Sequence, residues 1–479
     1  MNVYIGTLFL YFAVMLLIGY LATKRIKTFD DFALMGRRAA PWLVVATISA
    51  SWYGAGTVTG LPSTVFKSGF TPAFGWMLGA SLGFILVIKL APRVARTRLR
   101  TIPDILEARY GLAARYLGMI GLLGTWSTYI GYQIIAVGWV LDVGAGIPPR
   151  PWGFLLGFGI VFLYTIAGGL YSVVWTDFIQ SLIMFVGLTL AIPFGLKALG
   201  GVVPAVEAIS QAGGPAMLTP FGAGFLVFLG WALQLGGLAI VDPTTAQRLL
   251  AVGSPRKAQQ AAYGAVFMPF FFYSAVPLLA MFTRVLYPEI PNAEYSLLYL
   301  AKYMLPVVVG APLLAAVVAT IMSTADSALN ICSTLIVNDV YKRLINPNAS
   351  ERQLVFWGRV FVAVWAVYGL VLAFALPGVL AGLKIAYTIM AGVVMPSWVA
   401  AFLWRRATGA GAVAAMALSL VTVIWWNFWP PYPISAVIPT MAMSVLALVA
   451  VSLLTKPPAP EQLELFKVPR EGNLAVKEG

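Results

Sequence analysis

Six hydrogen-bonding side chains recur along an otherwise apolar stretch, residues 315–343. The six residues are Thr320, Ser323, Thr324, Ser327, Asn330 and Thr334. At about 100° per residue they share one narrow face of a helix, and Asp326 lies at the margin of that face. Hydroxyls and amides facing hydrocarbon would lack partners, so this face must meet protein, water or an ion. Two interpretations stand: a polar seam between packed helices, or one wall of an ion site.

A second stretch, residues 46–62 (ATISASWYGAGTVTGLP), is rich in small and hydroxylated residues. Its glycines Gly54, Gly56 and Gly60 weaken a helix, while Ser and Thr side chains can bond the freed backbone groups. Glycines serve equally well where two helices cross closely. We favour a broken helix because Trp52 and Tyr53 interrupt the small-residue pattern. Inside a bilayer such a break must be buried in protein or line a cavity.

Two further polar positions are ambiguous. Gln133 ends a polar and aromatic face that begins at residue 125, and it suits a helix–helix hydrogen bond or a ligand contact. Asp177 precedes a long apolar run. It can be a charge stabilised by a helix N-terminus or an ionisable group of a functional site.

Membrane helices must position these residues. The chain has 479 residues, of which 60% are hydrophobic and 10% charged, far from the composition of soluble domains. Apolar stretches of about 20 residues recur, and they predict spans centred near residues 12, 53, 81, 128, 160, 186, 234, 271, 322, 364, 391, 418 and 445. The chain has no histidine, which excludes His-based metal sites and proton relays, and its single cysteine, Cys332, excludes an internal disulfide.

The net charge of +14 is distributed unevenly across these spans. With the N-terminus outside, 25 of the 31 basic residues fall in inside segments, and the outside set is Lys67, Arg150, Lys197, Arg284, Lys302 and Lys384. This bias predicts a multi-pass protein of the cell membrane with a cytoplasmic C-terminus. The bias explains the positive charge without a nucleic-acid partner. The lipid bilayer is the expected surrounding of the protein, and no obligate protein partner is indicated.

The seventh span, residues 224–243, has a second soft middle at 230–237 (GWALQLGG), five spans after the first. We therefore predict one transmembrane domain, 1–479, with inverted repeats at 41–198 and 222–405. A leading helix and loop occupy 1–40, two accessory helices 406–455 and a cytoplasmic tail 456–479. In inverted-repeat transporters, solute and ion sites lie at the breaks in the first helix of each repeat.

Several motifs resemble the sodium/solute symporter family. The stretches at 168–187 (GGLYSVVWTDFIQSLIMFVG) and 321–343 (IMSTADSALNICSTLIVNDVYKR) are similar to two of its signatures. MGRR at 35–38, PDILEARYG at 103–111 and Gln247-Arg248 also fit, so the likeness covers about residues 1–410. The resemblance implies an all-α polytopic membrane protein with a LeuT-like 5+5 core, one preceding helix, two following helices and about 13 transmembrane helices.

The resemblance also implies a sodium site, built from the carbonyls of Ala50, Tyr53 and Thr320 and the hydroxyls of Ser323 and Thr324. Such oxygens suit a hard cation. In some members a second ion binds at positions that correspond here to Asp177, Asp326 and Ser327. Asp326 stands where those members use serine, so the number of ions and a role for protons stay open. Asn330 and Thr334 are then assigned to packing.

The solute is expected beside the two breaks, where the resemblance implies contacts with Trp52, Tyr53, Thr57, Phe74, Gln133, Trp231, Gln234 and Tyr387. No Lys or Arg is among them, so a carboxylate would rely on helix N-termini and hydroxyls, whereas the tryptophans suit a cationic amine or simply pack. We predict sodium-coupled symport of an amino acid or small carboxylate by alternating access, with no organic cofactor and no enzymatic activity. The alternatives are uptake of a quaternary amine such as choline or of a sugar, proton coupling, or a non-coupling channel or sensor.

Overall fold

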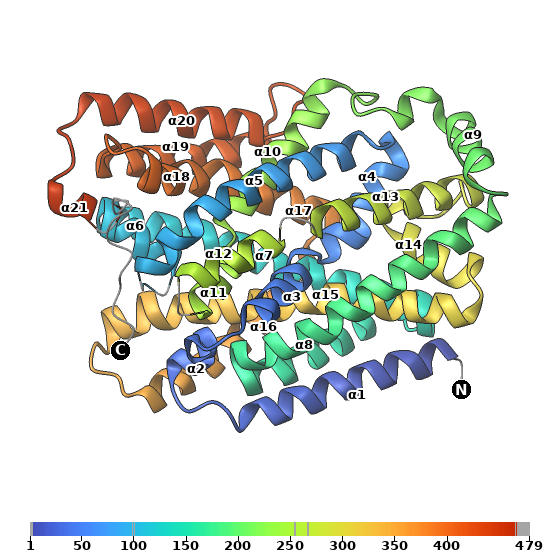
Figure 1. Ribbon diagram of the computed structural model, residues 1–479, viewed down its shortest axis with the longest axis horizontal. Helices are drawn as coiled ribbons and strands as arrows, with labels where there is room; N and C mark the ends of the chain where they lie inside the picture. The colour runs from blue at the N-terminus through green and yellow to red at the C-terminus, as the bar shows by residue number, and fades with distance from the viewer. Residues whose placement is uncertain are drawn as a thin grey trace.

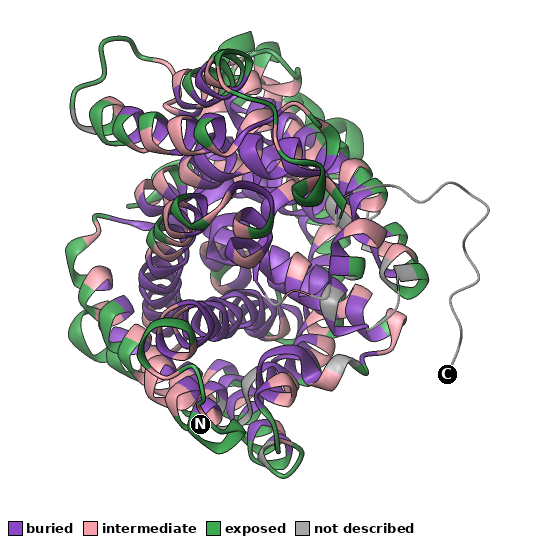
Figure 2. Cartoon of the chain, turned by 90° about the vertical axis from the view of Figure 1, so that its left-hand side faces the viewer, coloured by how far each residue is buried: buried purple, intermediate pink, exposed green. Residues whose placement is uncertain are grey.

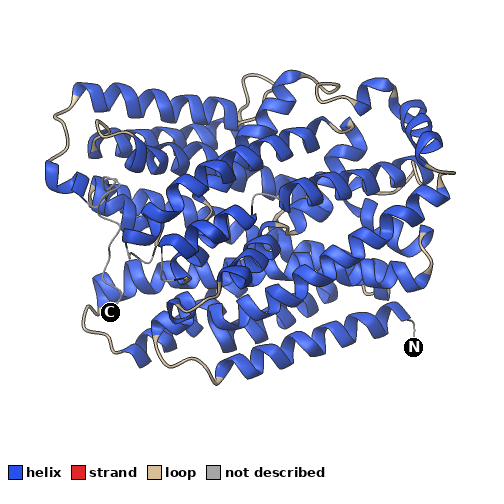
Figure 3. Ribbon diagram, in the orientation of Figure 1, coloured by secondary structure: helices blue, strands red, loops and turns tan. Residues whose placement is uncertain are grey.

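The computed structural model describes residues 3–97, 99, 101–252, 255–265, 268–464 and 466, and all regular structure in these ranges is helical (Figure 3). The long helices run broadly side by side along the longest axis of the molecule (Figure 1). Buried residues fill the centre of this bundle and exposed ones lie on its rim (Figure 2). The predicted all-α architecture is confirmed.

The first part of the chain contains one leading helix and the first set of core helices. Its elements are α1 (Val3–Thr23), α2 (Phe29–Leu34), η1 (Met35–Arg37), α3 (Pro41–Trp52), η2 (Gly56–Gly60), α4 (Leu61–Ser68), α5 (Thr71–Thr97), α6 (Ile102–Tyr110), α7 (Leu112–Ala145), η3 (Pro149–Gly153) and α8 (Phe154–Ala198).

The second part follows a peripheral connection. Its elements are α9 (Val202–Gly213), η4 (Pro215–Leu218), α10 (Phe225–Val241), α11 (Pro243–Ala251), α12 (Pro255–Ala265), α13 (Met268–Leu286), η5 (Ala293–Tyr295), α14 (Ser296–Tyr299), η6 (Leu300–Met304), α15 (Val307–Ile336), η7 (Val337–Ile345), α16 (Glu351–Ala375), α17 (Val379–Thr388), η8 (Ile389–Val394) and α18 (Met395–Leu403). Two further long helices and one short one follow, α19 (Gly409–Phe428), α20 (Val437–Leu454) and α21 (Pro460–Glu464).

The predicted spans are helical, although their number differs from the prediction. The described residues contain nine helices long and apolar enough to cross a membrane, or ten with a bent pair formed by Leu112–Ala145 and Pro149–Leu163. Two more predicted spans correspond to shorter apolar helices, Pro41–Trp52 and Phe270–Leu286. The predicted spans near 160 and 186 both lie within α8, whose 45 residues would reach about 68 Å if straight, twice the thickness of a hydrocarbon core. The count of about 13 is therefore not confirmed.

Short helices between the spans begin at capping residues. In α6, the Thr101 hydroxyl accepts from the Asp104 N–H, and the Asp104 carboxylate accepts from the Thr101 N–H. The same reciprocal arrangement starts α2 at Thr28 and α16 at Ser350. These caps satisfy N–H groups that a first helical turn leaves free.

α15 is the central helix of the bundle. It packs against α7, α8, α16 and α1, and it is buried along almost its whole length (Figure 1). Beyond its C-terminal end, η7 meets a group of charges in which Arg115 of α7 contacts Asp104, Glu107 and the buried Asp339. The ion-pair group fixes the end of α15 relative to α6 and α7. The hydroxyl stripe thus belongs to a helix that neighbours hold on every side.

The chain's short connecting helices separate into two groups. α2, α6 and α21 lie at one end of the bundle, whereas α9, α14 and the start of α1 lie at the other (Figure 1). The first group belongs to the segments that carry most of the basic residues. The fold therefore gathers the basic segments on one side, as a positive-inside distribution requires.

Candidate functional site

The second predicted span is interrupted where its glycines indicated. α3 ends at Trp52, and Tyr53 leaves the helical conformation with φ −108° and ψ 83° before η2 begins at Gly56. The carbonyl of Gly54 accepts from the N–H groups of Thr57 (2.9 Å) and Val58 (3.2 Å). The predicted broken helix is confirmed.

Gln133 of α7 reaches into this break. Its side-chain oxygen accepts a 2.8 Å hydrogen bond from the backbone N–H of Ala55, which satisfies a group that the break sets free. Its Nε2 atom is buried and has no partner within the described residues. Gln133 therefore supports the break and also offers a donor to a further molecule.

Carbonyls at the end of α3 meet the hydroxyl stripe of α15. The Ser323 hydroxyl lies 2.8 Å from the Ala50 carbonyl oxygen and 2.9 Å from that of Thr320. The Thr324 hydroxyl donates to the Ser51 carbonyl oxygen at 3.1 Å. The last four carbonyls of a helix lack intrahelical donors, so α15 supplies the donors that α3 needs.

Four of the five predicted sodium ligands therefore gather at one place, namely Ala50, Thr320, Ser323 and Thr324. Tyr53 lies at the end of the same helix, and its ring stacks on Phe272 of α13 with 3.8 Å between ring centroids. Carbonyl oxygens and small hydroxyls of this kind are the ligand set that a hard monovalent cation takes when backbone is freed at a break.

Gly54 allows α3 and α15 to approach this closely. A Cβ at residue 54 would lie 2.6 Å from the Thr324 hydroxyl oxygen and would also collide with Nε2 of Gln133. Any other residue would therefore push the break away from the hydroxyl stripe. Close approach rather than backbone conformation explains this glycine.

The second candidate ion position contains an arginine. The Arg248 guanidinium of α11 donates through Nη2 to Asp177 (3.0 Å) and Ser327 (2.8 Å), and both charged side chains are fully buried. Ser51 lies 3.1 Å from both the Asp177 carboxylate and the Ser327 hydroxyl. A protein cation thus lies among oxygens that the resemblance assigned to a second sodium.

Further groups complete this Arg248 network. Thr47 accepts from Nε of Arg248 at 2.8 Å and donates to Oδ2 of Asp177, while Nη1 of Arg248 reaches the Thr244 carbonyl. Oδ1 of Asp177 has no partner within the described residues. Asp326 lies beside the network, with its Oδ1 atom 3.3 Å from the Ser327 hydroxyl. The sequence offered Gln247-Arg248 only as a motif, so the role of Arg248 was missed.

The break predicted inside the seventh span lies elsewhere. α10 continues unbroken through residues 230–237, and the chain breaks at Asp242, which caps α11 by accepting from the N–H groups of Thr244 and Thr245. The prediction was wrong because its glycines serve packing: a Cβ on Gly237 would lie 2.5 Å from the Cα of Ala391. An Asp followed by Pro243 is a helix-start signal that could have located the break.

Trp52 connects the two breaks. Its indole N–H lies 2.9 Å from the Asp242 carboxylate and 3.0 Å from the Thr245 hydroxyl, and its ring packs on Phe84 of α5. These contacts account for its polar atom without a solute. Trp52 therefore joins α3 to α11 in the structure, apart from the aromatic cluster described next.

An aromatic cluster surrounds the other side of the first break. Trp76 of α5 packs against Trp231, Tyr273 and Tyr387 with centroid distances of 5.6, 5.4 and 5.8 Å. Tyr129 of α7 continues the cluster to Tyr387. Of the predicted solute contacts, Trp231 and Tyr387 thus belong to one group, whereas Phe74 packs near its own neighbour Phe70.

Buried polar atoms around this cluster have no hydrogen-bond partner within the described residues. They are Thr57 Oγ1, Trp76 Nε1, Tyr132 OH, Gln133 Nε2, Tyr273 OH and Gln234 Oε1. Each buried unsatisfied group costs about 1–3 kcal/mol, and native proteins keep few of them. These donors and acceptors, close to aromatic faces, are groups to which a small polar molecule or water would hydrogen-bond. Tyr132 lies on the polar and aromatic face that precedes Gln133, whereas Trp76 and Tyr273 were not predicted, because single aromatics in apolar helices carry no sequence signal.

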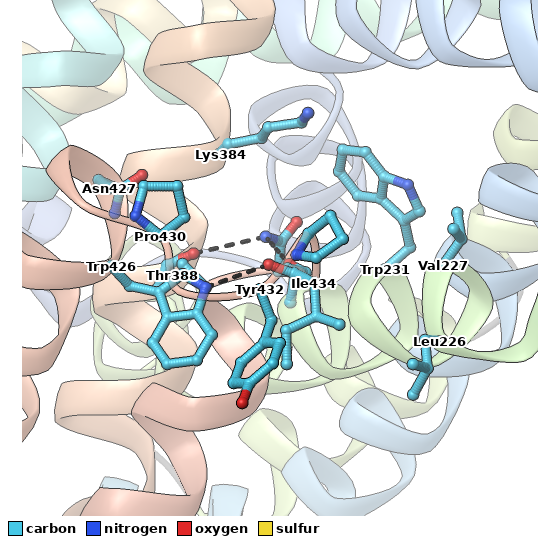
Figure 4. Close-up of a pocket in the computed structure, with 14 residues that line it drawn as sticks. Leu226, Val227, Trp231, Lys384, Thr388, Trp426, Asn427, Pro430, Tyr432 and Ile434 are labelled. Carbon is cyan, nitrogen blue, oxygen red and sulfur yellow. Dashed lines mark hydrogen bonds between the residues drawn. The ribbon is translucent and has the colours of Figure 1, made fainter.

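A cavity of about 380 Å³ adjoins this cluster. Its walls come from α10, α17, the end of α19 and the segment that follows α19. The residues that line it include Trp231, Gln234, Lys384, Thr388, Trp426 and Asn427 (Figure 4). Gln234 donates to Thr388 (3.4 Å) and Ser435 (3.3 Å) across it. Trp231 and Gln234 thus lie between the cavity and the aromatic cluster.

A helix broken at Tyr53, freed carbonyls facing hydroxyls and a central cluster of unpaired polar atoms define an α-helical secondary transporter of the LeuT-like fold. The chain belongs to the sodium:solute symporter family, whose model matches residues 32–419. It is accordingly a multi-pass membrane protein that couples sodium to the transport of a small organic solute, and it is not an enzyme.

Individual proteins agree with this assignment. The chain is 28% identical over 480 residues to the sodium/proline symporter of Salmonella typhimurium, covering 94% of this chain and 93% of the relative. It is 29% identical over 475 residues to the high-affinity proline transporter of Bacillus subtilis, covering 94% and 98%. The solved structure of a Na⁺-coupled sialic acid symporter in a substrate-bound outward-open state shares the fold, with a TM-score of 0.78 at 20% identity over 95% of this chain and 98% of that one.

Proposed function

We propose that the protein takes up proline, or a small amino acid of similar shape, together with sodium. The observation that carries this proposal is the group of unpaired buried polar atoms beside Trp76, Tyr273 and Tyr387. Aromatic faces suit the apolar ring of such a solute, and the hydroxyl, amide and indole groups suit its charged ends. The names of the two proline-transporting relatives support the same solute class.

We place the solute beside the first break, with Thr57, Gln133, Trp231, Gln234 and Tyr387 among its contacts. Thr57 and Gln133 come from the break and from the helix that supports it, and both have an unpaired buried atom. Trp52 and Phe74 stay predictions as solute contacts, since the contacts described above place each with other neighbours.

The sodium site that we propose is formed by Ala50, Tyr53, Thr320, Ser323 and Thr324. Within the described residues no group of three or more Cys, Asp or Glu side chains converges on a metal position, so neutral oxygens are the ligands that a cation would find. The Ser323 and Thr324 hydroxyls already lie against carbonyls of α3. An ion there would bind α3 and α15 together, which couples its occupancy to the position of the broken helix.

We further propose that one sodium ion accompanies each solute. Asp177 and Ser327 both bond to the Arg248 guanidinium, whose charge occupies the place that a second cation would need. Two cations sharing one buried carboxylate would repel each other strongly in a low-dielectric interior. Asp326 and a second ion or proton stay the alternative, and the reversal potential of uptake measures the stoichiometry directly.

The orientation that we propose places the N-terminus outside and the C-terminus in the cytoplasm. The gathering of basic segments at one end of the bundle supports it (Figure 1). Repeats at 41–198 and 222–405, a leading segment 1–40, accessory helices at 406–455 and a tail at 456–479 follow the same layout. Most of that tail, residues 467–479, lies outside the described residues.

Uptake into proteoliposomes tests the ion and the solute together. An inward sodium gradient should drive accumulation of radiolabelled proline, whereas glucose and choline should not compete. A proton gradient without sodium should drive none. Equilibration without accumulation would instead identify a channel.

Paired substitutions on one helix test the sodium ligands. Replacing Ser323 and Thr324 by Ala should raise the sodium concentration for half-maximal uptake by about tenfold or more, since hydrogen-bonding contacts to a charge contribute about 1.5–3 kcal/mol each. The matched control is Ser333→Ala with Thr334→Ala on the same helix, where the Ser333 hydroxyl bonds to Gly358 instead of α3. An unchanged sodium dependence in the first pair would refute the site.

A further inference from the structure

The cavity beside the aromatic cluster carries an uncompensated positive charge. Lys384 lines it and makes no hydrogen bond or ion pair with any described residue. Figure 4 shows its side chain extending along one side of the cavity, between Trp426 on one wall and Trp231 on the other. A lysine with no partner in a hollow of this size is available to a ligand.

The acidic side chain of the neighbouring hollow already accepts hydrogen bonds from the backbone. Glu294 lines a neighbouring hollow of about 650 Å³ that shares Lys384 and Asn427 with the first. Its carboxylate accepts from the N–H groups of Val379 (3.3 Å) and Leu380 (2.9 Å) at the start of α17. Lys67 adds a further positive charge close to both side chains. The mouth of the cavity therefore favours anions.

Gln234 supplies the complementary group. Its Nε2 donates to Thr388 and Ser435, whereas its Oε1 is buried and has no partner within the described residues. Gln234 itself is only 2% exposed. The two hydrogen bonds that Nε2 donates hold the amide of Gln234 in place. Its Oε1 atom is then the acceptor that an ammonium or a ring N–H of a solute needs.

The cavity also leads toward the central site. Trp231 lines it and packs on Trp76 of the aromatic cluster, 5.6 Å between centroids. The side chains of Trp231 and Trp76 would thus separate a solute in the cavity from the rest of the aromatic cluster beside the first break. With the orientation proposed above, α17 begins on the outer side, so the cavity lies where an entering solute arrives.

We propose that this cavity is an entry subsite for a zwitterionic amino acid, in which Lys384 binds the carboxylate and Gln234 Oε1 the amino group, while Trp231 and Trp426 face the apolar part. This inference rests on the proposed amino-acid transport. It assigns Lys384 a role in selecting and capturing the solute, whereas Trp231 and Gln234, which lie between the cavity and the central site, would contact the solute in both places.

Three lysine variants of the full-length protein test the subsite in proteoliposomes at fixed sodium. Lys384→Gln should raise the KM for proline about three- to tenfold with kcat nearly unchanged, because a charge-assisted contact on the entry path is lost. Lys384→Arg should retain most of the wild-type KM. Lys197→Gln, an exposed outer-side lysine of α8 away from the cavity, removes the same charge and should leave KM unchanged.

An analogue without the carboxylate gives a second readout. Prolinamide, which lacks the carboxylate, should compete more weakly than proline for the wild type, and Lys384→Gln should reduce that preference by the same factor as it raises KM. Added KCl should raise KM in the wild type and have little effect in the variant. Thermal unfolding checks that each variant is folded.

The outcomes separate the two proposals. If the wild type accumulates proline while Lys384→Gln keeps both the KM and the preference over prolinamide, the entry subsite is refuted and the transport function stands. If the wild type neither binds nor accumulates proline, the proposed solute is wrong and the subsite falls with it.

Discussion

Replacing Arg248 by Met should destabilise the protein by about 3–5 kcal/mol, the cost of removing one partner from a buried ion pair. Arg248 and Asp177 are both fully buried and 3.0 Å apart. Methionine retains most of the volume of the arginine side chain. The loss of stability therefore measures the removal of the positive charge and of its hydrogen bonds rather than a cavity. The carboxylate of Asp177 would keep Thr47 and Ser51 as donors but would have no counter-charge.

A double-mutant cycle isolates the pair. Asp177→Asn alone leaves the Arg248 charge unpaired and should cost a similar amount, whereas the double variant removes both charges of the pair and should cost clearly less than the sum of the two. We expect a coupling energy of at least about 2 kcal/mol, since residues in one network couple by about 0.5–3 kcal/mol and buried charge pairs lie at the upper end. The free energy of unfolding in detergent, followed by tryptophan fluorescence, gives each value.

Sodium supplies a second test of the same network. Without Arg248, the two carboxylate oxygens of Asp177, with Ser51 and Ser327 nearby, form an anionic site that a cation can fill. Sodium should therefore stabilise Arg248→Met more than it stabilises the wild type, and potassium should do so less. Arg352→Met, on an exposed position of α16, is the control and should change stability by less than about 0.5 kcal/mol. A coupling energy below about 0.5 kcal/mol would refute the reasoning.

Two further perturbations follow from the geometry. Gly54→Ala should lower sodium-driven uptake at least about tenfold, because its Cβ would lie 2.6 Å from the Thr324 hydroxyl oxygen. The control is Gly124→Ala, whose Cβ meets open space and which should fold and transport normally. Normal uptake by Gly54→Ala would contradict the close approach of α3 and α15. Burial raises the pKa of Glu294 above its ordinary 4.5, although the Leu380 and Val379 N–H groups and Lys67 act to lower that pKa. Above pH 4.5 the folded protein thus binds more protons than the unfolded chain, so the free energy of unfolding should fall as pH rises through the folded-state pKa of Glu294. Thermal unfolding measured across pH should show this slope, and Glu294→Gln should flatten it. An unchanged slope in the variant would assign the pH dependence to another group.

Much of the helical framework could be predicted from the sequence, because hydropathy and small-residue patterns are local. Residues 46–62 indicated a break, and the break lies at Tyr53–Ala55. Residues 230–237 gave a similar pattern, and there the helix is continuous. The two cases differ in what the glycines face: Gly54 meets the hydroxyl stripe and a polar side chain, whereas Gly237 meets an alanine of η8. The local sequence pattern cannot distinguish a broken helix from a close helix crossing, because the difference depends on which side chains of another helix the glycine faces.

The sequence by itself determined the hydroxyl face of α15, because a period of about 3.6 residues places side chains on one side of any helix. It also determined that this face must be shielded from lipid. Only the tertiary structure decided what shields it. Packing brings the α3 carbonyls to Ser323 and Thr324, and it brings Arg248 to Asp177 and Ser327. These pairings join residues up to 273 positions apart, and no periodicity encodes them, because they depend on how separate helices pack.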